Sequence, residues 1–305
     1  MSGVALHDLT MLEAIGAGLL QGVAIVFPIS GLGHGVLIGS LGNGVGSDLA
    51  PEHARYLYAA LRLAVAAALL AYYWRDWLHV LRGLSGAMVR CGPAAGRRWS
   101  GLLLLAAAPG CIGVALLAGP ARSLLAHPRL AAAGLAVNGA IMLGTWWWWR
   151  RSPRAGGMSG THRARLSRSE QAETFALELA SLRPGRAVLL GVMPLGALVP
   201  GISGIALTLA AALILGLTHE QAAHVALMLM VPFLLTWGLV ELPDLGAPRY
   251  DGVRLHLVVA LVLAAGAAYL TAVLLVRYFR RASLRPFAYY CLVAGAAAWV
   301  AYALT

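Results

Sequence analysis

The chain has 305 residues, of which 60% are hydrophobic and only 11% are charged, and its mean hydropathy is +0.77. A soluble core of this size cannot bury so much apolar surface, so the composition excludes a soluble globular protein and indicates a polytopic membrane protein. The net charge of +11 comes with arginine as the only basic residue besides histidine, gathered between apolar segments. No basic stripe with interleaved aromatic residues occurs, and we expect no nucleic-acid partner.

The first unusual stretch is residues 21–34, QGVAIVFPISGLGH. It is apolar enough for a bilayer, but Pro28 and three glycines interrupt it and would leave backbone groups unpaired in lipid. Such a break is tolerated only inside protein or beside a water-filled cavity. The apolar runs at residues 11–27 and 33–41 are shorter than the roughly 20 residues that a span requires. The sequence therefore predicts a re-entrant helix-loop-helix hairpin.

Three spans follow, at residues 56–74, 101–119 and 130–149, and the last of these ends in four tryptophans typical of a membrane interface. The segment 150–186 carries eight arginines. We expect it to be a cytoplasmic linker whose residues 169–182 form an amphipathic helix on the membrane surface.

A second broken stretch repeats the first. Pro28-Ile29-Ser30-Gly31 reappears, with one glycine inserted, as Pro200-Gly201-Ile202-Ser203-Gly204. The apolar runs at residues 187–199 and 205–217 are again too short to cross a membrane. Two broken segments in corresponding halves point to a binding site formed between them.

Spans at residues 222–242, 255–276 and 286–304 complete the prediction. We expect an all-α integral membrane protein with an inverted-topology repeat, two re-entrant hairpins and about six transmembrane helices. Residues 1–305 then form one transmembrane domain, with repeat one at about 9–149 and repeat two at about 187–305.

The arginines predict the orientation. The loops 75–98, 150–186 and 277–285 hold 17 of the 23 arginines and lie on one side if both hairpins return to the side they enter from. The positive-inside rule places these loops in the cytoplasm and both termini outside.

The two hairpins resemble those of the bacterial undecaprenyl-diphosphate phosphatases, the BacA or UppP family. The family motifs read E-G-x-x-E-F-x-P-[IV]-S-S-T-G-H and P-G-x-S-R-S-G. Trp74-Arg75, Pro109 and the string at 286–290, PFAYY, also match, so the resemblance covers nearly the whole chain. It implies a protein of the bacterial inner membrane with a pocket at the hairpin tips. In the family, glutamates of this pocket hold a metal or transfer protons, a serine and a histidine act on the phosphorus, and an arginine binds the diphosphate.

This sequence departs from the motifs at their charged positions. The two glutamates align with Gln21 and Ile25, the arginine aligns with Gly204, and a later glutamate aligns with His224. The second serine and the threonine of the first motif align with Gly31 and Leu32, and the serine after the arginine with Ile205. We therefore expect no divalent-cation cofactor and an impaired or lost hydrolysis.

Candidate site residues follow from the shared motifs and from Arg62, an ionisable residue inside a span. Arg62 either binds phosphate or extends to the nearby external surface, and His224 faces either the second tip or the cytoplasmic interface. Ser30 and Ser203 are also suited to capping the helices that follow them. The catalytic candidates are His34 and Ser203, and the substrate-binding candidates are Gln21, Ser30, Gly31, Arg62, Gly201, Gly204 and His224, with no metal ligand.

Three functions remain open from the sequence. The first is a protein that binds or moves a polyprenyl phosphate or diphosphate lipid carrier without hydrolysing it. The second is an active undecaprenyl-diphosphate phosphatase that uses His34, Arg62 and Ser203. The third is a secondary transporter of another small solute, since inverted repeats with broken helices are common among transporters. The expected partners are the lipid and the bilayer, and a homodimer is left open.

Overall fold

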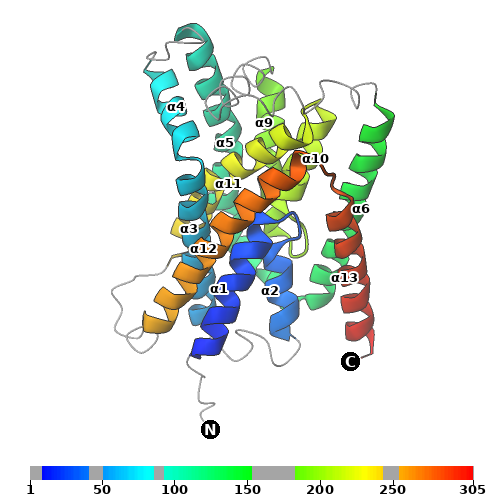
Figure 1. Ribbon diagram of the computed structural model, residues 1–305. Coiled ribbons are helices and arrows are strands. Elements are labelled where there is room, and N and C mark those ends of the chain that lie inside the picture. The colour runs from blue at the N-terminus through cyan, green and yellow to red at the C-terminus, as the bar shows by residue number, and fades with distance from the viewer. Residues whose placement is uncertain (1–8, 41–50, 86–92, 153–182, 243–253, 305) are drawn as a thin grey trace.

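The computed structural model describes residues 9–40, 51–85, 93–152, 183–242 and 254–304, and these residues contain helices and no strand. The interfacial helix predicted at residues 169–182 and most of the linker lie outside the described residues. Helix α1 (Met11–Val26) begins at Thr10, whose side chain accepts a hydrogen bond from the Glu13 backbone N–H in a capping box. It ends two residues before Pro28, and α2 (Gly31–Ser40) returns toward the same face of the molecule (Figure 1).

The first full span differs from the prediction at its C-terminal end, where a second helix follows. Helix α3 (Pro51–Tyr72) is followed, after a bend of 75°, by α4 (Trp74–Leu84). The prediction of a loop from residue 75 is thus wrong for α4. Trp77 and Val80 recur at helical spacing and face the protein, while Arg75 and Arg82 share the helix with them. This amphipathic pattern extends the helix beyond the apolar run and packs it against α5.

The remaining elements complete the two predicted halves. The first half continues with α5 (Pro93–Ala121), the 3₁₀ helix η1 (Arg122–Ala126) and α6 (Pro128–Arg151). The second half contains α9 (Pro184–Val192), the 3₁₀ helix η3 (Met193–Leu198), α10 (Gly204–Ile214), α11 (His219–Glu241), α12 (Arg254–Phe279) and α13 (Arg285–Ala303). In the described residues five helices are long and apolar enough to cross a membrane, and the bent pair α3–α4 makes a sixth, which confirms the predicted number.

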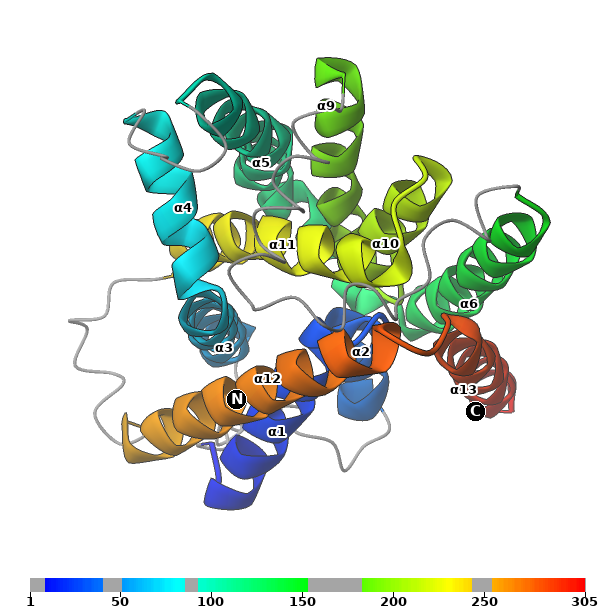
Figure 2. The same cartoon turned by 45° about the horizontal axis from the view of Figure 1, so that its top comes forward.

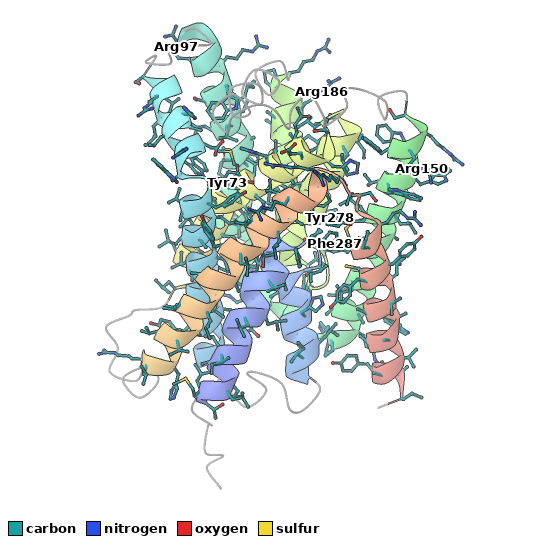
Figure 3. The ribbon with its side chains drawn as sticks, in the orientation of Figure 1. Tyr73, Arg97, Arg150, Arg186, Tyr278 and Phe287 are labelled. Carbon is teal, nitrogen blue, oxygen red and sulfur yellow. The ribbon has the colours of Figure 1, made fainter. Side chains whose placement is uncertain are left out.

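The hairpins enter the molecule from opposite faces. Helix α1 starts and α13 ends at the lower face in Figure 1, whereas α9 descends from the upper face toward the centre. Arg97, Arg150 and Arg186 all lie at the upper face (Figure 3). The arginine-rich ends of the helices are therefore on the side opposite to the start of α1 and the end of α13.

Helices from the two halves pack against one another in pairs: α1 with α12, α5 with α9, α3 with α11, and α6 with α13 (Figure 2). Small residues bring these helices close together. A methyl group on Gly22 would come 2.8 Å from Ala267 Cβ of α12, and one on Gly139 would come 2.7 Å from the carbonyl oxygen of Ala288 in α13. Close backbone approach replaces the hydrophobic effect as the source of helix association in lipid.

Candidate functional site

The tips of the two hairpins touch at the centre of the protein. A methyl group on Gly33, in the first turn of α2, would come 2.6 Å from the Cα of Gly201. Gly201 has a φ of +89° and Ser30 a φ of +68°, the left-handed backbone that tight turns require. The breaks in both hairpins are thus surrounded by protein, which is the condition for irregular backbone at membrane depth.

The side chain of Asn138, on α6, joins the two tips. Its Nδ2 donates to the carbonyl oxygen of Pro28 at 3.0 Å, and its Oδ1 accepts from the N–H of Ser203 at 3.0 Å. The side chain is fully buried. Sequence reasoning missed this residue, although a lone asparagine inside an apolar span is a signal of buried hydrogen bonding.

Both tip serines cap the helix that follows them, as expected. Ser30 Oγ accepts from the N–H of Gly33 at 3.2 Å, and Ser203 Oγ accepts from the N–H of Ala206 at 3.3 Å. The hydroxyl proton of each serine remains available as a donor. Because both residues line the same cavity, the two hydroxyl groups and the N-terminal ends of α2 and α10 converge on one space.

This cavity lies between the tips, α3 and α11 and contains about 440 Å³ of empty space, part of it continuous with the outside. Most of its wall is apolar. Tyr58 and Trp237 line it as well and were not singled out from the sequence. Six of the predicted site residues line it: Gln21, Ser30, Gly31, Arg62, Ser203 and Gly204.

Arg62 supplies the cavity with a cationic side chain. It is only 7% exposed, its guanidinium lies 3.9 Å from the centroid of the Trp237 ring, and its Nη1 pairs with Glu241. Arg122 Nε lies 3.3 Å from the other carboxylate oxygen of Glu241. Two guanidinium groups therefore share one buried carboxylate, which leaves an excess of positive charge beside the cavity. Glu241 was missed, although a buried arginine requires a counter-ion.

His34 is held just outside the cavity. Its Nδ1 lies 2.8 Å from the carbonyl oxygen of Ser30, which can only accept, so this nitrogen carries the proton. Nε2 then accepts from the hydroxyl of Tyr290, on α13, at 2.8 Å, and the two rings stack. This arrangement places the proton of the neutral ring on Nδ1 and ties the first tip to α13. Tyr290 was also missed as a site residue, although its string was noticed.

Replacing Tyr290 by phenylalanine tests whether this contact matters for function. The loss of one hydrogen bond is expected to lower the free energy of unfolding by about 0.5–1.5 kcal/mol and to change turnover only if the orientation of His34 is used in the reaction. Tyr289→Phe is the matched control: Tyr289 and Tyr290 are both 46% exposed, and Tyr289 also loses one hydrogen bond, from Arg285 Nη2 at 3.4 Å, whereas the bond to His34 is made by Tyr290. Turnover is therefore the measurement that separates the two variants, and equal turnover would show that the contact with His34 has no role in the reaction.

Two predicted residues lie away from the cavity. His224 Nε2 is 3.2 Å from Asp76 of α4, and its ring lies 4.7 Å from that of Tyr73, so it faces α4 rather than the second tip. Gly201 forms the contact between the tips instead of the cavity wall, because its Cα lies against Gly33 and α6.

The positions that depart from the family motifs lie at the cavity itself. Gln21 and Ile25 line it one turn apart on α1, and Gln21 Nε2 donates to the carbonyl oxygen of Gly31 at 3.2 Å. At Gly204 a Cβ atom would come 2.7 Å from the carbonyl oxygen of Pro194. The close approach of η3 therefore leaves no room for a side chain at position 204, and Arg62 is the cation that the cavity contains.

The donors at the cavity do not fit a divalent cation. Among the described residues, no three His, Cys, Asp or Glu side chains lie close enough to hold a metal ion. The described cavity wall offers amide and hydroxyl oxygens next to the positive charge of Arg62, whereas Mg²⁺ and Ca²⁺ sites use carboxylates.

In the described residues, five candidate spans and the bent pair α3–α4 surround two opposed hairpins whose tips border one largely apolar cavity, and this arrangement defines a multi-pass α-helical membrane protein. Residues 14–297 match the family described as bacitracin resistance protein BacA. The chain belongs to this family.

Named relatives are similar over nearly their full lengths. Undecaprenyl-diphosphatase 2 of Frankia alni is 35% identical, with 98% of this chain and 100% of the relative covered. The undecaprenyl-diphosphatase of Mycolicibacterium paratuberculosis is also 35% identical, with 97% and 98% covered. That of Granulibacter bethesdensis is 32% identical, with 98% and 99% covered. The resemblance found in the hairpin motifs is confirmed.

Proposed function

We propose that this protein binds a polyprenyl diphosphate in the cavity between the hairpin tips and hydrolyses it to the polyprenyl phosphate. The observation that carries this proposal is the position of Arg62, a buried cation at a cavity lined by two serines and two helix N-terminal ends. Such ends and a guanidinium group both favour phosphate oxygens. The names of the full-length relatives support the choice of lipid and of reaction.

The reaction consumes one water molecule. Its oxygen bonds to the terminal phosphorus, the bond from this phosphorus to the bridging oxygen breaks, and the bridging oxygen stays with the polyprenyl phosphate. The terminal phosphorus leaves as inorganic phosphate, which carries away the oxygen and the protons of the water. Phosphoryl transfer requires positioning and neutralisation of charge on the phosphate oxygens. In this cavity Arg62 supplies the charge, and the hydroxyl groups of Ser30 and Ser203 and the N–H groups at the starts of α2 and α10 supply donors.

A second candidate is lipid binding or translocation without hydrolysis. It is favoured by the described cavity wall, which contains no carboxylate or imidazole to act as a base. Glu241 is tied to two arginines, and both ring nitrogens of His34 are hydrogen bonded.

One assay separates the two candidates. Purified protein is incubated with undecaprenyl diphosphate, with added Mg²⁺ or with a chelator, and released phosphate is measured. We expect release that persists in chelator, since the cavity donors do not fit a divalent cation. Binding of the lipid without release would support the second candidate, and neither binding nor release would favour transport of an unrelated solute.

The orientation and the repeat belong to the same proposal. We place the protein in the bacterial inner membrane with the arginine-rich face in the cytoplasm and the termini outside. The pairing of α1 with α12 and of α5 with α9 supports the inverted repeat, because exchanging the two halves exchanges these pairs. A homodimer stays a prediction.

A further inference from the structure

The amide of Asn138 satisfies two backbone groups that have no helical partner. The carbonyl oxygen of Pro28 lies in the break between α1 and α2, and the N–H of Ser203 lies in the break before α10. Buried backbone groups of this kind require a partner. An amide is the side chain that offers a donor and an acceptor at the same time, so one residue completes both breaks.

The two bonded groups both lie in the repeated motif, next to residues that line the cavity, although Pro28 corresponds to Pro200 in the repeat and not to Ser203. Pro28 stands two residues before Ser30, and Ser203 directly precedes Gly204; Ser30, Ser203 and Gly204 line the cavity. The distance between these cavity residues therefore depends on a side chain that does not itself line the cavity.

One turn before Asn138, helix α6 packs against the second tip. A methyl group on Gly134 would come 3.0 Å from the Cα of Gly201. On the next turn, Gly139 lies against the backbone of Ala288 in α13. Because α6 is fixed on both sides, the short side chain of Asn138 has a defined reach, and a longer or shorter one would not meet both tips.

We infer that Asn138 is a positioning residue that sets the spacing of the two hairpin tips, and with it the alignment of the diphosphate between Ser30, Ser203 and Arg62. The effect of Asn138 on turnover rests on the proposed function. Its contact with both tips is a property of the fold and can be measured without substrate.

The decisive variant is Asn138→Asp, which keeps the shape of the side chain. The ionised carboxylate still accepts from Ser203 but repels the carbonyl oxygen of Pro28, whereas the protonated acid can donate to it. Where the carboxylate is ionised, we expect turnover about 100-fold below wild type, since a misplacement of about 1 Å costs this much, with a much smaller change in KM. Position 138 is fully buried, and burial disfavours the ionised form, so the protonated acid should replace it and the ratio of variant to wild-type turnover should rise as the pH is lowered from about 8 to about 5.

Dividing by the wild-type rate at each pH removes the titration of His34 and of other shared groups. Cys291 Sγ lies 3.5 Å from Asn138 Nδ2, so the profile is repeated in a Cys291→Ala background to remove this titratable neighbour. Thr145→Val is the matched control: Thr145 is a buried polar residue of the same helix, but its hydroxyl donates within α6 to Ile141 and touches neither tip. Its turnover should equal that of the wild type.

Hydrogen exchange at the N–H of Ser203 reports the contact independently of catalysis. Asn138→Leu should remove its protection, and Thr145→Val should keep it. Wild-type turnover of Asn138→Asp at all pH values, or unchanged protection in Asn138→Leu, would overturn the inference. If the wild-type protein releases no phosphate, the proposed function fails, and binding of the same lipid replaces turnover as the readout for Asn138.

Discussion

Replacing Arg62 by methionine is expected to raise KM for the diphosphate lipid about 10- to 100-fold, because a hydrogen bond to a charged group contributes about 1.5–3 kcal/mol. The same change leaves Glu241, which is 5% exposed, with Arg122 alone as its counter-ion. Removing one partner of a buried ion pair costs about 3–5 kcal/mol of stability. Phosphate release and thermal unfolding in detergent measure the two effects.

A double variant separates substrate binding from stability. Arg62→Met combined with Glu241→Leu removes both buried charges, and an apolar pair of similar volume is expected to restore stability to within about 1 kcal/mol of wild type. KM should stay raised, since no cation has returned to the cavity. Recovery of a wild-type KM in the double variant would show that Arg62 stabilises the fold and does not bind substrate.

Replacing Gly201 by alanine is expected to have the largest effect on the fold. Its φ of +89° is costly for any residue with a Cβ, by about 1–3 kcal/mol. The added methyl would also come 2.5 Å from the backbone nitrogen of Leu135, and overpacking of this kind costs about 1–3 kcal/mol more. Relief by movement of the tip would separate it from Gly33, so phosphate release should fall about 100-fold even where the protein still folds.

Gly144→Ala provides the control for this prediction. Gly144 lies on α6, the helix that Gly201 packs against, but no atom comes within 4 Å of the position that its Cβ would take. Alanine is the better helix former by about 1 kcal/mol, so the variant should be as stable as wild type or slightly more stable. Equal thermal stability of Gly144→Ala and Gly201→Ala would contradict the close contact between the tips.

The positions of the helices were largely predictable, because each depends on residues close together in the sequence. The limits of α1 follow from Thr10 and Pro28, and the lengths of the apolar runs separate spans from hairpin limbs. The prediction was wrong for α4, where amphipathic spacing continues the helix after the apolar run ends. In that region the hydropathy falls while the helical periodicity continues, and periodicity is the stronger signal outside lipid.

The polar contacts of the site could not be predicted in the same way. Glu241 meets Arg62 from a position 179 residues away, and Tyr290 meets His34 from 256 residues away. A single sequence contains no information on which of several distant side chains fills a given space, because the pairing follows from how the helices cross.

The sequence was sufficient to predict that two broken, repeated hairpins in an otherwise apolar chain meet inside the protein, since unpaired backbone is not tolerated in lipid. It also showed that the charged residues of the family motifs are missing from positions 21, 25 and 204. The three-dimensional structure was needed to show that these positions surround one cavity, that Arg62 is its cation, and that Asn138 joins its two walls. Packing between distant helices determines these contacts, and position 204 illustrates the reason: the backbone of Pro194 occupies the space that a side chain would need.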